Sequence, residues 1–97
     1  MPTYITLFRF TQQGIKTIKE SPTRIESAKK AYRAMGAEMK QWYLTTGQYD
    51  GVVVSEAAND ETMAKIALSI GSLGNIQTET LRAFTEDEFR AMVAKLP

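Results

Sequence analysis

The chain has 97 residues, enough for one domain of residues 1–97 and too few for two separate cores. It is 43% hydrophobic and 24% charged, as a folded globular protein is, and its net charge of +1 favours neither nucleic acid nor a membrane surface as a partner. It contains no cysteine and no histidine, which excludes disulfides, thiolate nucleophiles, Cys/His zinc sites, histidine-held haem and Ser-His-Asp catalysis.

The first predicted elements are a strand and a helix. Residues 3–10 are apolar on both sides of an extended chain, which predicts a strand covered on both faces. A short helical turn is predicted within residues 12–19. Ser21 is predicted to cap a helix whose first residue is Pro22, and Gly36 suits the position just after that helix. Its apolar stripe is formed by Ile25, Ala28, Tyr32 and Met35.

Two further strands are predicted at residues 39–45 and 49–56, joined by a hairpin-length connection at residues 46–48. Three consecutive valines in the second of them again indicate a strand buried on both faces.

The second half of the chain repeats the order of helix and strand. Asn59 can cap a helix, with Asp60 and Glu61 well placed against its dipole, and residues 71–75 end it. Residues 76–84 are predicted to be the fourth strand. A capping box at residues 85–88 then begins a short C-terminal helix. The inner stripes of these two helices are Met63, Ile66, Ala67, Ile70 and Phe89, Met92, Val93, Leu96.

The fold class is therefore α+β: a ferredoxin-like β-α-β-β-α-β arrangement with a four-stranded antiparallel sheet and an added C-terminal helix. Two helices cover only one face of such a sheet, while the other face is also apolar. A monomer would expose that face as a large apolar patch. We therefore expect a homodimer or larger homo-oligomer in which two sheets face each other, as in a dimeric α/β barrel.

Compartment and macromolecular partners follow from what the sequence lacks. No basic segment precedes the first apolar run, and the longest uncharged stretch, residues 66–78, is too short to cross a bilayer. The basic cluster between Lys16 and Arg33 has no accompanying aromatic stacking motif for RNA. We expect a cytoplasmic protein that binds neither nucleic acid nor a membrane.

Several short motifs follow one another along the whole chain. They are Gly14-Ile15-Lys16, Glu20-Ser21-Pro22, Arg24, Trp42-Tyr43-Leu44 followed by Gly47-Gln48-Tyr49-Asp50, Glu56-Ala57, Gly71-Ser72-Leu73-Gly74-Asn75 and Thr80-Leu81-Arg82-Ala83-Phe84-Thr85. In this combination the sequence resembles the GYD-domain family of small bacterial and archaeal proteins. The resemblance implies a dimeric α/β-barrel-like fold, but no particular activity. Gly51 departs from the pattern, since such proteins more often have a branched apolar residue there.

The candidate ligand-binding residues are polar groups in or beside the predicted strands. Asp50 could act as a general base or anchor a ligand, or could instead accept backbone N–H bonds within the hairpin while Tyr49 packs. Arg9 and Arg82 could clamp an anionic ligand, or form structural ion pairs with nearby carboxylates. Glu56 could take part in acid–base chemistry or pair with an arginine. Tyr43 could line an aromatic pocket or pack in the core or at an interface. The full candidate set is Arg9, Tyr43, Tyr49, Asp50, Glu56 and Arg82.

Three functions remain open from the sequence. The first is a module that binds a small organic ligand beside the sheet without turnover. The second is a cofactor-independent isomerase or oxygenase in which Asp50 or Glu56 removes a proton and Arg82 or Tyr49 stabilises the enolate. The third is an assembly protein with no ligand. We expect no cofactor. We also expect no metal site, because successive carboxylates such as residues 86–88 on one helix cannot all face one ion.

Overall fold

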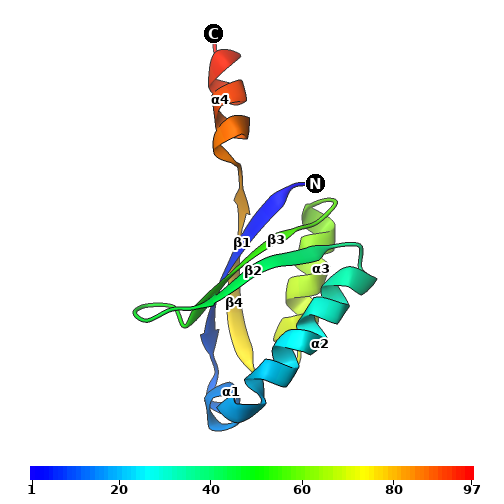
Figure 1. Ribbon diagram of the computed structural model, residues 1–97, viewed down its shortest axis with the longest axis vertical. Helices are drawn as coiled ribbons and strands as arrows, with labels where there is room; N and C mark the ends of the chain where they lie inside the picture. The colour runs from blue at the N-terminus through cyan, green and yellow to red at the C-terminus, as the bar shows by residue number, and fades with distance from the viewer.

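The computed structural model describes residues 1–97 as one sheet with helices on one side of it (Figure 1). The elements are β1 (Thr3–Phe10), α1 (Gln12–Lys16), a 3-10 turn η1 (Ile18–Glu20), α2 (Ser21–Ala34), β2 (Glu38–Leu44), β3 (Gly51–Glu56), α3 (Asp60–Gly71), β4 (Ile76–Ala83) and α4 (Glu86–Ala94).

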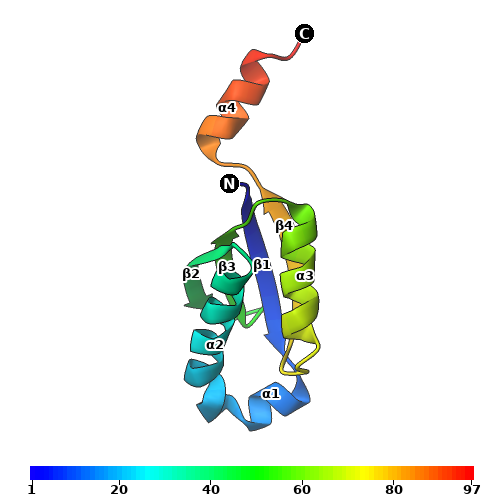
Figure 2. The same ribbon diagram turned by 90° about the vertical axis from the view of Figure 1, so that its right-hand side faces the viewer.

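The strands lie in the order β2-β3-β1-β4, and each neighbouring pair is antiparallel. The two central strands are thus the first and third of the chain, as the ferredoxin-like arrangement requires. Helices α2 and α3 lie against the same face of the sheet (Figure 2). The fold class predicted from the sequence is confirmed. No helix is both long and apolar enough to pass through a membrane.

The two faces of the sheet have different environments. Along β1 and β3 every second residue is buried beneath the helices, and the residues between them are only partly covered. The prediction that these strands are covered on both faces is therefore not met within a single chain. We call the uncovered side the open face; its apolar residues are Ile5, Leu7, Tyr43, Val52, Val54 and Leu81.

The core beneath the helices is small and occupies one end of the sheet. Only 12 of the 97 residues are buried. The main cluster comes from β1, α2, α3 and the segments just before β2 and just after β3. Its members are Tyr4, Tyr32, Ala37, Ala57, Met63 and Ile66.

Most predicted boundaries hold within two residues, and the exceptions have local causes. Ser21 is the first residue of α2 and not its cap, because the turn η1 runs directly into the helix. Strand β3 begins at Gly51 and not at Tyr49. The caps at Asn59 and Thr85 form as predicted, including both hydrogen bonds of the capping box. Gly36 follows α2 with a φ of 76°, which a residue with a side chain rarely adopts.

Gly51 is explained by its neighbour across the sheet. A Cβ atom at this position would lie 2.1 Å from Cζ of Phe8 and 2.9 Å from the carbonyl oxygen of Tyr43. The Phe8 ring therefore occupies the space that a branched side chain at this position would need.

Helix α4 projects beyond the end of the sheet, away from the other helices (Figure 1). Its apolar stripe does not join the core: Phe89 is 60% exposed, and Met92, Val93 and Leu96 are exposed as well.

Candidate functional site

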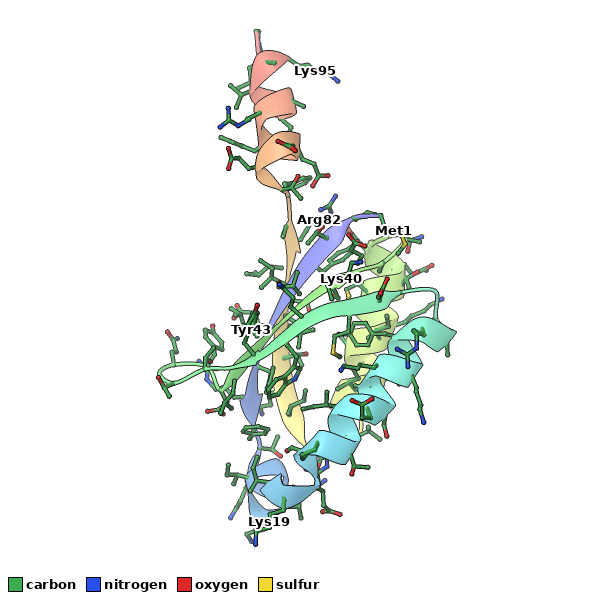
Figure 3. All side chains as sticks on the ribbon, in the orientation of Figure 1. Met1, Lys19, Lys40, Tyr43, Arg82 and Lys95 are labelled. Atoms are coloured by element: carbon green, nitrogen blue, oxygen red, sulfur yellow. The ribbon has the colours of Figure 1, made fainter.

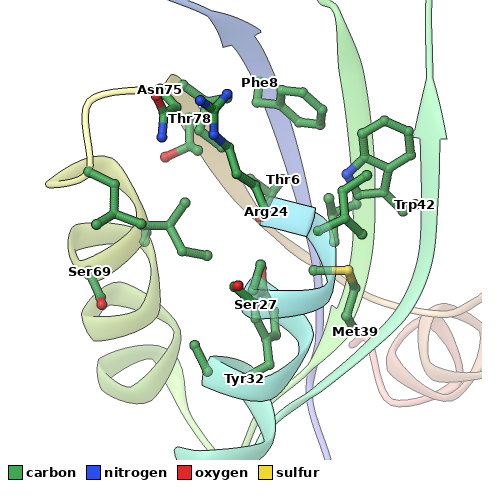
Figure 4. Close-up of a pocket in the computed structure, with 18 of the residues that line it drawn as sticks. Thr6, Phe8, Arg24, Ser27, Tyr32, Met39, Trp42, Ser69, Asn75 and Thr78 are labelled. Carbon is green, nitrogen blue, oxygen red and sulfur yellow. The ribbon is translucent and has the colours of Figure 1, made fainter. Parts of the chain in front are cut away.

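A cavity of about 290 Å³ lies between α2, α3 and the sheet, next to the core cluster (Figure 4). It arises because several helix residues that face the sheet are small. Ala28 and Ala31 on α2 and Ala67 on α3 line it, and none of them reaches far enough to fill the space between the two layers. The volume is just below the range of about 300–1,000 Å³ that is typical of small-molecule sites.

The wall of the cavity is mainly apolar and aromatic. Phe8 is central to the aromatic side, with its ring centroid 5.7 Å from that of Trp42 and 5.7 Å from that of Phe10. Met39, Met63 and Ile70 are among the aliphatic lining residues. Trp42 is the single tryptophan of the chain, so it is a built-in fluorescent reporter for this cavity.

Polar groups enter the cavity from the strands and from α2. Thr6 and Thr80 share a hydrogen bond of 3.2 Å between their hydroxyls, and Thr78 lines the same region. Arg24 on α2 is the one charged lining residue. Its Nη2 donates to Oγ1 of Thr17 at 2.5 Å and to a carboxylate oxygen of Glu20 at 3.3 Å.

Tyr32 also lines the cavity, and burial raises the pKa of its phenol above the ordinary value of 10.0. It is therefore a neutral group near pH 7. No Asp or Glu side chain lines this cavity.

A second, smaller cavity of about 240 Å³ shares Met63 and Thr80 with the first and is also bordered by Tyr4, Asp60 and Arg82. The Tyr4 hydroxyl donates to Oδ1 of Asp60 at 2.5 Å. Burial raises the pKa of Tyr4, and the hydrogen bond to the Asp60 carboxylate raises it further.

Two of the candidate residues form a cluster on the open face. The guanidinium of Arg9 lies 4.4 Å from the ring centroid of Tyr49, and its Nε donates to the carbonyl of Gln48 at 2.8 Å. The Tyr49 hydroxyl donates to Oε2 of Glu79 at 2.6 Å, and this bond raises the pKa of the phenol. Residues from β1, the β2–β3 loop and β4 thus meet at one corner of the sheet.

Asp50 ties the β2–β3 loop to the neighbouring strand. Its carboxylate accepts the backbone N–H of Phe10 at 2.9 Å, and its own N–H donates to the carbonyl of Phe8 at 2.8 Å. The carboxylate of Asp50 therefore has a structural role toward β1, while its backbone carbonyl accepts the N–H of Thr45 at 2.9 Å and closes the hairpin.

The other candidates are dispersed. Tyr43 is exposed on the side of the sheet away from α2 and α3 (Figure 3). Glu56 lies at the far end of the open face, 3.7 Å from Nζ of Lys40. Arg82 lies near the end of β4, with its guanidinium 4.2 Å from the ring centroid of Phe84 and 5.6 Å from that of Tyr4.

The structural ion pairs that were one interpretation of the two strand arginines do not form. Neither Arg9 nor Arg82 forms an ion pair. Aromatic rings and backbone carbonyls take the place of carboxylates: Arg82 donates to the carbonyls of Thr3 and Ala83. A guanidinium stacks on an aromatic face without the desolvation that a buried ion pair requires.

None of the six candidates lines the larger cavity, and only Arg82 borders the smaller one. The sequence reasoning missed Arg24, although a signal was present. Arg24 precedes Ala28 by four residues and Tyr32 by eight, which places it on the inner stripe of α2. The alternation of Thr78 and Thr80 with Glu79 and Leu81 likewise placed hydroxyls on the covered face of β4.

The sheet order, the two helices on one face and the cavity beneath them define a small ferredoxin-like α+β protein with an internal pocket. The chain belongs to the GYD-domain family, whose model, described as the GYD domain, matches residues 4–93.

Two proteins of Thermus thermophilus are similar to most of this chain. A protein of Thermus thermophilus, named glutamine synthetase and cystathionine beta-lyase binding protein, is 36% identical over 84 residues, which are 86% of this chain and 88% of that protein. A crystal structure of a protein from Thermus thermophilus has a TM-score of 0.56 and 25% identity, covering 88% of this chain and 95% of that one.

A more distant likeness concerns the fold alone. A feast or famine regulatory protein from M. tuberculosis, complexed with L-methionine, has a TM-score of 0.64 and 16% identity, covering 90% of this chain and 54% of that one.

Proposed function

We propose that this protein binds a small organic ligand with an apolar body in the larger cavity and releases it unchanged. The observation that carries the proposal is the cavity itself, an apolar space of about 290 Å³ under α2 and α3 lined by 23 residues, of which 14 are hydrophobic. An apolar cavity next to a small core reduces stability unless something fills it, since the lining atoms lack packing partners. A ligand of matching shape supplies those contacts.

Binding without turnover fits the chemistry of the wall. General acid–base catalysis at neutral pH needs a group whose pKa is near 7 and whose proton is within reach of the substrate. The lining contains no carboxylate and, since the chain has none, no imidazole or thiol. Tyr32 is held in its neutral form by burial. The threonine hydroxyls can orient a ligand, but they have no adjacent base that would make them nucleophiles.

Filling the cavity tests the proposal. Ala31→Phe places a ring in the cavity, and Ala34→Phe places the same ring on the exposed side of the same helix. Binding of octanoate and of 1-octanol is followed by Trp42 fluorescence. We expect saturable binding in the wild type and in Ala34→Phe, and at least a tenfold loss in Ala31→Phe. Equal affinity in all three proteins would show that binding takes place elsewhere.

We further propose that two copies pair through their open faces. The chain exposes 6615 Å², whereas a folded monomer of 10.9 kDa is expected to expose about 5,600 Å². The excess of about 1,000 Å², to which the projecting helix α4 also contributes, compares well with the roughly 800 Å² that each partner buries in a standard interface.

This pairing would place several of the sequence candidates between the two sheets. Arg9, Tyr43, Tyr49 and Glu56 all lie on the open face. Their role as ligand-binding residues stays a prediction of the sequence analysis, and it depends on the second copy.

A second candidate function is the binding of partner enzymes. It is supported by the Thermus thermophilus relative, which is named for binding glutamine synthetase and cystathionine beta-lyase and matches 86% of this chain. The test is to mix this protein with purified glutamine synthetase and measure the mass of the complex by light scattering after size exclusion. A defined complex supports this candidate, and two separate peaks at micromolar concentrations argue against it.

A further inference from the structure

We propose that the ligand of the larger cavity is an organic monoanion, an apolar body with one carboxylate or similar head group, and that Arg24 receives this group. The inference rests on the proposed function and specifies its chemistry.

The first support is the charge of the lining. Of the 23 residues around the cavity, Arg24 is the one with a charged side chain, and the remainder are apolar groups, hydroxyls and one amide. A cationic ligand would meet a like charge at the wall, since Glu20, the carboxylate paired with Arg24 at 3.3 Å, does not line the cavity. A neutral ligand would leave the arginine without a partner in the cavity. An anion satisfies it, and attraction between opposite charges is strong beside a wall of low polarity.

The second support is the set of donors that Arg24 keeps free. Only Nη2 donates within the chain, to Thr17 and Glu20. Nε and Nη1 make no hydrogen bond there, although these atoms together with Nη2 form the planar set that binds carboxylates in two-pronged geometry. The two contacts on Nη2 hold the guanidinium in place, so that little side-chain freedom is lost when a ligand binds.

The third support is the position of Arg24 at the boundary between cavity and solvent. Its side chain is 29% exposed, while the apolar residues of the core cluster are nearly inaccessible. Figure 4 shows Arg24 on α2 among the lining side chains, with Trp42 and Met39 on the β2 side. A ligand can therefore keep its charged head at the partly hydrated rim and its apolar body inside. A head group at the rim also loses less hydration than one carried into the interior.

These three features select a chemical class. The body must be apolar and small enough for about 290 Å³, such as a medium-length alkyl chain or an aryl-alkyl group. The head must accept hydrogen bonds and carry negative charge. Alkanoates and aryl-alkanoates meet both conditions.

The test is a fluorescence titration of Trp42 with three probes that share one alkyl chain: octanoate, 1-octanol and octylammonium. The variants are Arg24→Gln, Arg24→Lys and, as the control, Arg33→Gln, which removes an exposed arginine of the same helix that does not line the cavity. Affinity for 1-octanol in each variant reports whether the cavity itself is intact.

We expect wild type to bind octanoate about tenfold more tightly than 1-octanol, as a charge-assisted hydrogen bond predicts, and to bind octylammonium most weakly. Arg24→Gln should remove the preference for octanoate and leave 1-octanol unchanged, Arg24→Lys should keep part of it, and Arg33→Gln should keep all of it.

Two results would overturn the inference in different ways. Equal affinity for octanoate and 1-octanol in wild type would show that the cavity binds apolar molecules without regard to charge. A preference for octanoate that survives Arg24→Gln would show that another group receives the carboxylate. In either case the proposed function would stand and the inference about Arg24 would not. If none of the probes binds, both the proposed function and the anion are wrong.

Discussion

The ring of Phe8 packs directly against Gly51 on the neighbouring strand, and this contact fixes the aromatic side of the cavity. The ring of Phe8 lies where a Cβ at position 51 would be, and the same ring contacts Trp42 and forms part of the cavity wall. A larger residue at position 51 would displace Phe8 and with it the aromatic side of the cavity.

We therefore expect Gly51→Ala to destabilise the protein by about 1–3 kcal/mol through overpacking. Gly71→Ala is the matched control, because no atom lies within 4 Å of a Cβ built there and its φ is ordinary. Urea unfolding followed by Trp42 fluorescence measures both. An unchanged midpoint for Gly51→Ala would mean that Phe8 moves freely and that the wall is not rigid.

Tyr4 makes the stability of the folded protein depend on pH in the alkaline range. The pKa of Tyr4 is raised from 10.0, first by burial and then by the hydrogen bond to Asp60. A raised pKa in the folded state means that the unfolded chain releases its proton first as the pH rises. The stabilising contribution is thus complete below pH 10 and is lost as the pH rises from about 10 through the folded-state pKa.

We expect the free energy of unfolding to fall more steeply above pH 10 in wild type than in Tyr4→Phe, which has no proton to release at that position. The measurement is urea unfolding at several pH values between about 8 and 11, with wild type and variant compared at each. Parallel curves for the two proteins would contradict the assignment, even if Tyr4→Phe is less stable at every pH through the loss of its bond to Asp60.

At the scale of elements, α3 and α4 have equally good N-terminal caps but different surroundings. Asn59 accepts the N–H of Thr62, and Thr85 accepts the N–H of Glu88. Helix α3 contributes Met63 and Ile66 to the core, whereas the apolar stripe of α4 is exposed. A lost cap reduces global stability only if the helix is coupled to the core.

Asn59→Ala should therefore lower the free energy of unfolding by about 1 kcal/mol, while Thr85→Ala should leave it unchanged. Both are measured by urea unfolding. A loss at Thr85 as large as that at Asn59 would show that α4 is packed against another surface in solution.

The sequence predicted best those features of the helices that depend on residues close together in the chain. Asn59 and Thr85 were predicted as caps because a cap involves residues three positions apart. Ser21 was assigned wrongly because the turn before it continues into α2. The order of the predicted strands and helices, together with the family resemblance, also predicted the fold class.

The cavity could not be predicted in the same way. It depends on how far α2 and α3 stand from the sheet and on which small side chains face inward, and both are tertiary properties. Arg9 and Arg82 attracted attention as charges in apolar strands, yet Tyr49 and Phe84 stack on them. Arg24 was overlooked because a charge in the first turn of a basic helix is ordinary.

At the scale of the whole molecule, the proposed dimer depends on the open face. Leu7 lies at its centre, between Val52 of β3 and Glu79 of β4. A charge there would be trapped between two sheets in the proposed dimer, and burying an unpaired charge costs several kcal/mol.

We expect wild type to sediment at twice the mass of the chain and Leu7→Glu to sediment as a monomer at micromolar concentrations. Leu68→Glu is the control, since Leu68 is 75% exposed on α3 and lies outside the open face. Sedimentation equilibrium distinguishes the two masses. A monomeric wild type would contradict pairing through this face, and so would a dimer that survives Leu7→Glu.

Native mass spectrometry of gently purified protein tests the central claim most directly, because it weighs the assembly together with anything in the cavity. We predict a dimer with a discrete non-covalent added mass, which disappears under denaturing conditions and in Ala31→Phe but persists in Ala34→Phe. An added mass of the same size and amount in Ala31→Phe would contradict binding in the cavity, and so would an empty wild type that also fails to take up octanoate or 1-octanol.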